Sequence, residues 1–189
     1  MLDRLRARLE RYLTAVGTKF SKLGLSPTAW TMVGLAVSIL AAYSYSASSY
    51  RGEAVGGVLV LVAGWFDVVD GAVARVTGKT SMRGAFVDST LDRVAEVAIF
   101  TGILIGHHSS ALIVLLALST SLLVSYTRAK GDALGIALSG VGIGERSERL
   151  IIIAVSSIIG LLDWGVILVL VVAAFTFLER IYRALKALP

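Results

Sequence analysis

The 189-residue sequence contains no cysteine, no asparagine and no glutamine, and only 16% of its residues are charged. The absence of cysteine excludes a disulfide scaffold and a thiolate metal site. The hydrophobic fraction is 56%, against roughly 45–50% in average soluble domains. This composition argues against a soluble enzyme, a disordered chain and a protein that binds nucleic acid. The lack of heat-labile amide and thiol side chains favours a thermophilic source.

Six apolar stretches predict an all-α integral membrane protein with six transmembrane helices. They cover Trp30–Ala47, Ala54–Val69, Phe86–Ile105, Ala111–Tyr126, Leu150–Leu162 and Val166–Phe177. The preceding segment 1–28 begins with arginines and leucines at helical spacing, which predicts an amphipathic juxtamembrane helix. We expect this helix to lie on the membrane surface or, alternatively, to pack on the first span. Residues 1–189 are expected to form a single domain.

All but one of the 18 lysines and arginines fall on one side of this six-span topology. The exception is Arg51, between the first two spans. Both termini and the two long polar connections carry the other basic residues, so the positive-inside rule places them in the cytoplasm. His107 and His108 fall in a short turn on the outer side and are expected to be solvated.

Four aspartates stand at informative spacings in the middle of the chain. Asp67 and Asp70 are three residues apart, and Asp88 and Asp92 are four apart, so each pair shares one face of a helix. If the two helix ends face one another, the four carboxylates converge, and a divalent cation would offset their repulsion. Oxygen ligands without His or Cys favour Mg²⁺ or Mn²⁺, with room for two ions of the kind that clamp phosphate displacements.

Small residues and an arginine accompany these aspartates. Gly71 follows Asp70 directly, and Gly84 precedes Asp88 by four positions. Glycine lets a ligand approach the backbone closely. Arg75 stands about one turn after Gly71 and can bind a phosphate with two hydrogen bonds. The pattern favours a site for a metal-bound pyrophosphate; the alternative is a set of Asp–Arg salt bridges between helices.

The combined pattern resembles the signature of the CDP-alcohol phosphatidyltransferase family at every fixed position. It reads Asp67-x2-Asp70-Gly71-x2-Ala74-Arg75-x8-Gly84-x3-Asp88-x3-Asp92. The resemblance implies six transmembrane helices, a polar cavity open to the cytoplasm, divalent metal ions and a homodimer. It also implies a reaction in which an acceptor hydroxyl attacks the β-phosphorus of a CDP-activated substrate and CMP leaves.

Residue roles follow from the same resemblance. It implies that metal ions are bound by Asp67, Asp70, Asp88 and Asp92. Asp92 would also be the catalytic base that deprotonates the acceptor hydroxyl. The nucleotide-binding residues would be Asp67, Asp70, Gly71, Ala74, Arg75 and Gly84.

A second group of cations follows the fourth apolar stretch. Taken alone, these residues indicate attachment to anionic lipid headgroups. The runs 125–130 and 144–150 resemble the subgroup that makes phosphatidylinositol phosphate or archaetidylinositol phosphate, with the pair Arg128 and Lys130 in reversed order. This resemblance implies that the phosphate of inositol 1-phosphate is bound by Arg128, Lys130, Arg146 and Arg180.

The expected donor is a CDP-activated lipid, either CDP-archaeol or CDP-diacylglycerol, and the thermophilic composition favours CDP-archaeol. Alternatives with the same chemistry are glycerol 3-phosphate, serine or an inositol derivative as acceptor, and CDP-inositol as donor. A protein of another class, an intramembrane cation transporter, would use the four aspartates as an ion path. Transporters often contain internal repeats, and residues 132–189 hold no second copy of the aspartate pattern.

Overall fold

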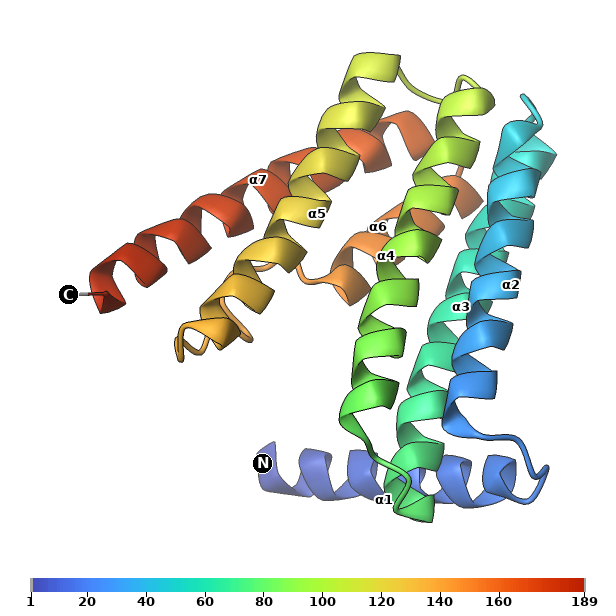
Figure 1. The fold of residues 1–189 in the computed structure, drawn as a ribbon. Helices are drawn as coiled ribbons and strands as arrows, with labels where there is room; N and C mark the ends of the chain where they lie inside the picture. Colours follow the sequence, from blue (N-terminus) through green and yellow to red (C-terminus); the bar gives the residue numbers. More distant parts are fainter. Residues whose placement is uncertain (1, 189) are drawn as a thin grey trace.

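The computed structural model describes residues 2–188, with side chains from residue 10 onward, and this range folds into seven helices and no strands (Figure 1). They are α1 (Leu2–Ser21), α2 (Pro27–Ser46), α3 (Tyr50–Thr77), α4 (Met82–Ile105), α5 (Ala111–Ala133), α6 (Arg146–Ile158) and α7 (Leu162–Ala187). α2 packs on both α3 and α4, and α5 packs on α7. α6 contacts α3 and α7 and so joins the two groups.

Serine caps define where several helices begin. The hydroxyls of Ser26, Ser49, Ser81 and Ser110 each accept a hydrogen bond from the backbone N–H three residues further on. Such caps satisfy donors that the first helical turn leaves unpaired. Pro27 occupies the first turn of α2, where its missing N–H costs nothing.

Among the described helices, four are long and apolar enough to cross a membrane: α2, α3, α5 and α7. α4 has 24 residues and sufficient length, but it carries charged residues of the candidate site. α6 has only 13 residues, fewer than the ~20 that a span requires. It ends earlier than the apolar stretch that reaches residue 162, because the chain turns at Gly160 with a positive φ of 75°.

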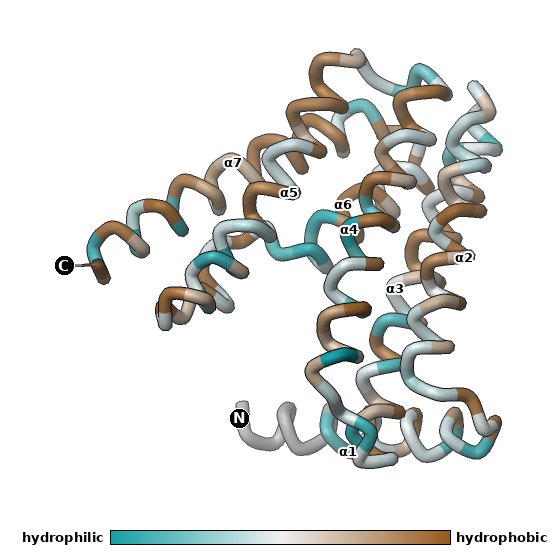
Figure 2. Tube along the Cα trace, in the orientation of Figure 1, coloured by the Kyte–Doolittle hydropathy of each residue, from teal (hydrophilic) through white to brown (hydrophobic). Residues whose placement is uncertain are grey.

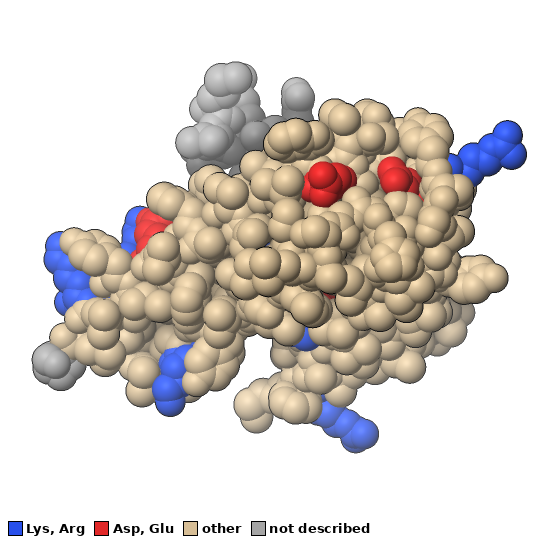
Figure 3. Space-filling view, turned by 90° about the horizontal axis from the view of Figure 1, so that it is seen from above, with Lys and Arg blue, Asp and Glu red and all other residues tan. Residues whose placement is uncertain are grey.

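Polar and apolar residues are distributed unevenly over the bundle. Hydrophobic residues follow much of α5 and α7, whereas hydrophilic residues gather near α1 and at the beginning of α6 (Figure 2). The end of the molecule opposite α1 shows mostly uncharged atoms, with isolated acidic patches and basic atoms toward its margins (Figure 3). Charged side chains are therefore sparse on the face opposite α1.

The described part of α1 packs on the protein. Val16 is buried against Trp30 and Val69, and the Phe20 and Trp30 rings meet edge to face at 5.1 Å. A Cβ at Gly17 would lie 2.5 Å from the carbonyl oxygen of Ala72, so this close crossing of α3 requires glycine. Of the two expected arrangements, packing is the one observed for residues 10–21, on α3 as well as on α2. The side chains that predict amphipathicity at positions 2–9 lie outside the described residues.

The turn between α4 and α5 corrects one expectation. The Nδ1 atom of His108 lies 2.7 Å from a carboxylate oxygen of Glu53, and its Nε2 atom lies 2.7 Å from the carbonyl oxygen of Tyr45. His108 is therefore enclosed and paired, whereas His107 is exposed as expected. The pairing has no signature in the sequence, because Glu53 reaches this turn only when the start of α3 packs beside it.

Candidate active site

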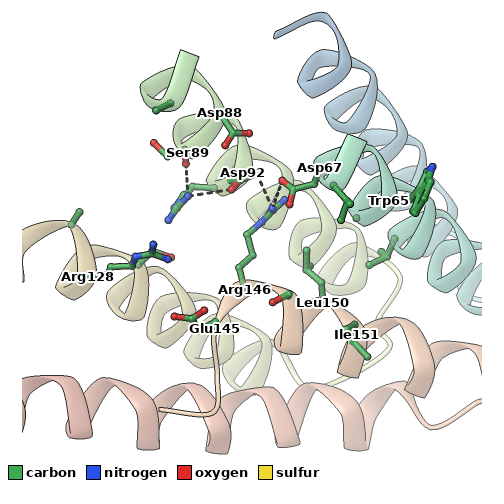
Figure 4. Close-up of a pocket in the computed structure, with 18 of the residues that line it drawn as sticks. Trp65, Asp67, Asp88, Ser89, Asp92, Arg128, Glu145, Arg146, Leu150 and Ile151 are labelled. Atoms are coloured by element: carbon green, nitrogen blue, oxygen red, sulfur yellow. Dashed lines mark hydrogen bonds and ion pairs between the residues drawn. The ribbon is translucent and has the colours of Figure 1, made fainter. Parts of the chain in front are cut away.

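A cavity of about 840 Å³ opens between α3, α4, α5 and the first turn of α6 (Figure 4). Its charged lining includes Asp67, Asp88, Asp92, Arg128 and Arg146. An apolar lining continues along α3 and α6 and includes Leu61, Trp65, Val68, Leu150 and Ile151. The cavity thus has one charged part and one hydrophobic part, as a site for a molecule with a phosphate head and an apolar tail requires.

Three aspartates converge at the charged part of this cavity. Asp67 and Asp70 of α3 and Asp88 of α4 each place one carboxylate oxygen within 4.8 Å of the others. One divalent ion can bridge oxygens at such separations. The Oδ1 atom of Asp88 is buried and has no hydrogen-bond partner in the described part of the chain, and a bound cation would satisfy it. The residues present therefore fit a metal with oxygen ligands.

Asp70 is bound by a side chain of the neighbouring helix α2. Its Oδ2 atom accepts a 2.8 Å hydrogen bond from the hydroxyl of Thr31, and only 7% of the residue is exposed. A small cavity of about 20 Å³, lined among others by Thr31 and Asp70, adjoins the cluster and is large enough for one water molecule. Thr31 was not predicted as a site residue, because its role depends on the packing of α2 against α3.

Arg146, the first residue of α6, reaches across the cavity to two aspartates (Figure 4). Its Nη1 atom lies 3.0 Å from Asp67 Oδ1 and 2.7 Å from Asp92 Oδ1. Arg93 also contacts Asp92, at 3.4 Å. Arg146 therefore links Asp92 to Asp67. Among the described residues, the carboxylates that lie within 4.8 Å of one another are those of Asp67, Asp70 and Asp88, without Asp92.

A second ion pair lies one helical turn further along α4 and α6. Arg149 donates to both carboxylate oxygens of Glu96, at 2.7 and 3.0 Å, and to the carbonyl oxygen of Gly144 at 2.6 Å. Both charged side chains are at most 1% exposed. Glu96 stands one turn after Asp92 on α4, and Arg149 stands one turn after Arg146 on α6. Two parallel pairs therefore join these helices, and sequence reasoning missed Glu96 although a carboxylate inside an apolar run is itself a signal.

Arg180 lies outside the cavity lining. Its guanidinium donates to the carbonyl oxygens of Val141 and Val124 and to Glu145, at 3.1, 2.8 and 3.1 Å, and its side chain is 2% exposed. Glu145 immediately precedes α6 and does line the cavity. In this structure Arg180 thus anchors the connection between α5 and α6 instead of facing the cavity.

The remaining predicted residues divide between the cavity and its surroundings. Arg128 lines the cavity (Figure 4), whereas Lys130 is exposed and is not among the lining residues. The candidate nucleotide residues in the last turns of α3 and at the start of α4 also lie outside this lining: Gly71, Ala74, Arg75 and Gly84. The Arg75 guanidinium lies beside Gly71: a Cβ atom placed on Gly71 would be 3.4 Å from Arg75 Nη1.

The chain belongs to the CDP-alcohol phosphatidyltransferase family, whose model matches residues 24–178. The archaetidylinositol phosphate synthase of Pyrococcus horikoshii is 35% identical over 188 residues, which cover 100% of this chain and 98% of that protein. The phosphatidylinositol phosphate synthase of Streptomyces avermitilis is 38% identical over 169 residues, which cover 85% of this chain and 68% of that protein.

Solved structures agree with this assignment. The crystal structure of Mycobacterium tuberculosis phosphatidylinositol phosphate synthase with CDP-DAG bound has a TM-score of 0.80 and 28% identity, covering 92% of this chain and 94% of that chain. Another crystal structure of that enzyme holds manganese and citrate, also with a TM-score of 0.80 and 28% identity, covering 92% of this chain and 89% of that chain.

These matches confirm the predicted family and class of enzyme. The protein is a CDP-alcohol phosphatidyltransferase with several helices apolar enough for a membrane. The manganese in the second crystal structure agrees with the predicted choice of Mg²⁺ or Mn²⁺. Because the members of this family are transferases, its match also argues against the alternative of an intramembrane cation transporter.

Proposed function

We propose that this enzyme transfers the archaetidyl or phosphatidyl group of a CDP-activated lipid to a hydroxyl of inositol 1-phosphate and releases CMP. The observation that carries this proposal is one cavity in which an acidic cluster, three arginines and an apolar lining meet. The acidic cluster suits a metal-bound diphosphate, the arginines suit a phosphorylated acceptor, and the apolar lining suits a lipid. The names of the relatives support the acceptor, and the CDP-DAG-bound neighbour supports the donor.

The aspartates have distinct roles in this reaction. Asp67, Asp70 and Asp88 would hold Mg²⁺ or Mn²⁺, with Asp92 beside them as a further ligand in a site for two ions. A bound divalent ion neutralises the charge that develops on the departing phosphate. Asp92 stands one turn beyond Asp88 and faces the cavity, where it would accept the proton of the acceptor hydroxyl. Arg93, which lies 3.4 Å from the Asp92 carboxylate, would orient it during the reaction.

The nucleotide would bind at the adjoining ends of α3 and α4. Gly71, Ala74 and Gly84 leave space next to the backbone there, and Arg75 would pair with the diphosphate. Its guanidinium already lies close to Gly71, next to the aspartate at position 70.

The acceptor phosphate would bind in the basic part of the cavity. Arg128 and Arg146 line it from α5 and α6, and Lys130 stands two residues after Arg128, near the end of α5. The phosphate contact expected for Arg180 would require its guanidinium to leave three protein partners. For Arg180 we therefore propose a supporting role through Glu145.

For the topology we propose six spans, α2–α7, in which α4 and the short α6 are embedded in the membrane together with their neighbours. The basic residues then place both termini and the cavity on the cytoplasmic side. The face of α1 that α3 does not cover would lie on the membrane surface. We further propose that residues 1–189 act as one domain and that the enzyme is a homodimer, as its family implies.

The decisive experiment is an acceptor screen on the purified protein with Mg²⁺. CDP-archaeol, CDP-diacylglycerol and CDP-inositol are each offered as donor, with radiolabelled inositol 1-phosphate, glycerol 3-phosphate, serine or inositol as acceptor, and CMP release is measured. We expect inositol 1-phosphate to be consumed with the highest kcat/KM. Preference for glycerol 3-phosphate or serine would overturn the acceptor, a requirement for CDP-inositol would overturn the donor, and absence of CMP release with every pair would overturn the activity.

A further inference from the structure

Arg146 is incompletely satisfied in the arrangement described above. A single nitrogen, Nη1, serves both Asp67 and Asp92, while its Nε atom is buried without a hydrogen-bond partner among the described residues. A buried donor that lacks a partner destabilises the arrangement that contains it. The guanidinium therefore neutralises the carboxylates without forming the full set of bonds that it can make.

Arg146 and a metal ion would compete for the same carboxylate. Asp67 is a member of the three-aspartate cluster that fits a divalent cation and is also a partner of Arg146. A guanidinium and a divalent ion a few ångströms apart repel each other strongly in a partly desolvated cavity. An ion that enters the cluster therefore displaces the guanidinium from Asp67, and with it weakens the contact to Asp92.

The displaced side chain has one direction in which to move. The backbone of α6 is fixed by two ion pairs: the fully buried pair of Arg149 with Glu96, and the pair of the buried Arg180 with Glu145, whose side chain is 30% exposed. Only the side chain of Arg146 is then free to swing, and the space beside it is the 840 Å³ cavity that Arg128 also lines. There it would meet an anionic ligand with its donors available.

We propose that Arg146 is the internal counterion of the acidic cluster in the metal-free enzyme and becomes a phosphate ligand when a divalent cation enters. Metal binding then creates the acceptor site and frees Asp92 at the same moment. By linkage, each ligand raises the affinity for the other. The choice of a phosphomonoester as the anion rests on the proposed function; the exchange of Arg146 between carboxylates and anion does not.

The first test is Mn²⁺ binding to the purified, metal-free, full-length protein, measured by electron paramagnetic resonance. R146Q is expected to bind Mn²⁺ about tenfold more tightly than the wild type, within the ~5–150-fold range typical of coupled sites. R146K retains the charge and is expected to stay close to the wild type. R128Q removes an equal charge from the same cavity, from a residue without an ion pair in the part of the chain that the structure describes, and is expected to change the affinity by less than about twofold.

The second test repeats the titration with inorganic phosphate and with inositol 1-phosphate. Either anion is expected to raise the Mn²⁺ affinity of the wild type, and this gain is expected to disappear in R146Q. Unchanged Mn²⁺ affinity in R146Q, or equal behaviour of R146Q and R146K, would overturn the counterion role. A gain that persists in R146Q would overturn the exchange. Coupling by inorganic phosphate without any CMP release in the acceptor screen would instead refute the proposed function alone.

Discussion

Asp92 and Glu96 stand one turn apart on α4, and each pairs with an arginine of α6, but the two pairs differ in burial. The Asp92 and Arg146 side chains remain 16% and 19% exposed beside the cavity, whereas those of Glu96 and Arg149 are at most 1% exposed. A partly solvated pair separates at little cost. A buried pair is strongly destabilising to break, because one charge stays behind without a partner. Two arginine–carboxylate pairs of the same kind therefore differ in role: the Asp92–Arg146 pair beside the cavity can exchange partners, whereas the buried Glu96–Arg149 pair cannot.

The largest effect on catalysis is expected from a substitution of Asp92, and none of this size on kcat is expected to arise from a catalytic role of Glu96. D92N removes the proposed base and is expected to lower kcat by about 10²–10⁴-fold, the usual contribution of general base catalysis. Thermal unfolding in detergent should change little, because Asp92 faces the cavity. CMP release and the melting temperature are measured on the same preparation, and unchanged turnover would remove Asp92 as the base.

E96Q is expected to lower the thermal stability of the protein, in contrast to D92N, which is expected to lower kcat. It leaves the Arg149 guanidinium buried without its counter-charge and is expected to destabilise the protein by about 3–5 kcal/mol, seen as a lower melting temperature. The double variant E96M/R149L replaces both charges with apolar side chains and should recover much of this loss. If E96Q unfolds like the wild type, the pair has no structural role.

A smaller effect is expected from the exchangeable pair. R146Q removes a charged hydrogen-bond partner of the acceptor phosphate, and such bonds contribute about 1.5–3 kcal/mol. The KM for inositol 1-phosphate should therefore rise roughly 10–100-fold, and the KM for the CDP-lipid should rise much less. Steady-state kinetics with each substrate varied in turn measures both constants, and an equal rise in both would contradict a specific contact with the acceptor.

The smallest effect concerns the support of the cluster from α2. T31V removes the hydrogen bond to Asp70 and is expected to weaken Mn²⁺ binding by about tenfold, as is usual for a group that orients a metal ligand. T31S keeps the hydroxyl and should retain the wild-type affinity. Equal affinities for T31V and T31S would show that the threonine does not orient Asp70.

The sequence predicts features that depend on spacing along a single helix. The apolar stretches locate the helices, and the intervals between aspartates place each pair on one face. Of the four carboxylates predicted to converge, Asp67, Asp70 and Asp88 lie within 4.8 Å of one another, whereas Asp92 lies beside them and pairs with Arg146. Features that depend on neighbours in space could not be predicted. Thr31 acquires its role from the packing of α2, and His108 finds Glu53 across the outer turn. Arg146 and Arg180 look alike in the sequence, but only Arg146 faces the cavity.

The two-part lining of the cavity has a consequence for how molecules enter and leave. A double-tailed donor that keeps its hydrocarbon against Leu61, Val68 and Ile151 stays in contact with a nonpolar phase throughout turnover. With the membrane position proposed above, its lipid product would diffuse back sideways into the bilayer without crossing water. The polar reactants, by contrast, exchange with the aqueous compartment through the charged mouth. Synthesis therefore occurs at the boundary of two solvents, and neither class of molecule has to be extracted from the solvent in which it dissolves.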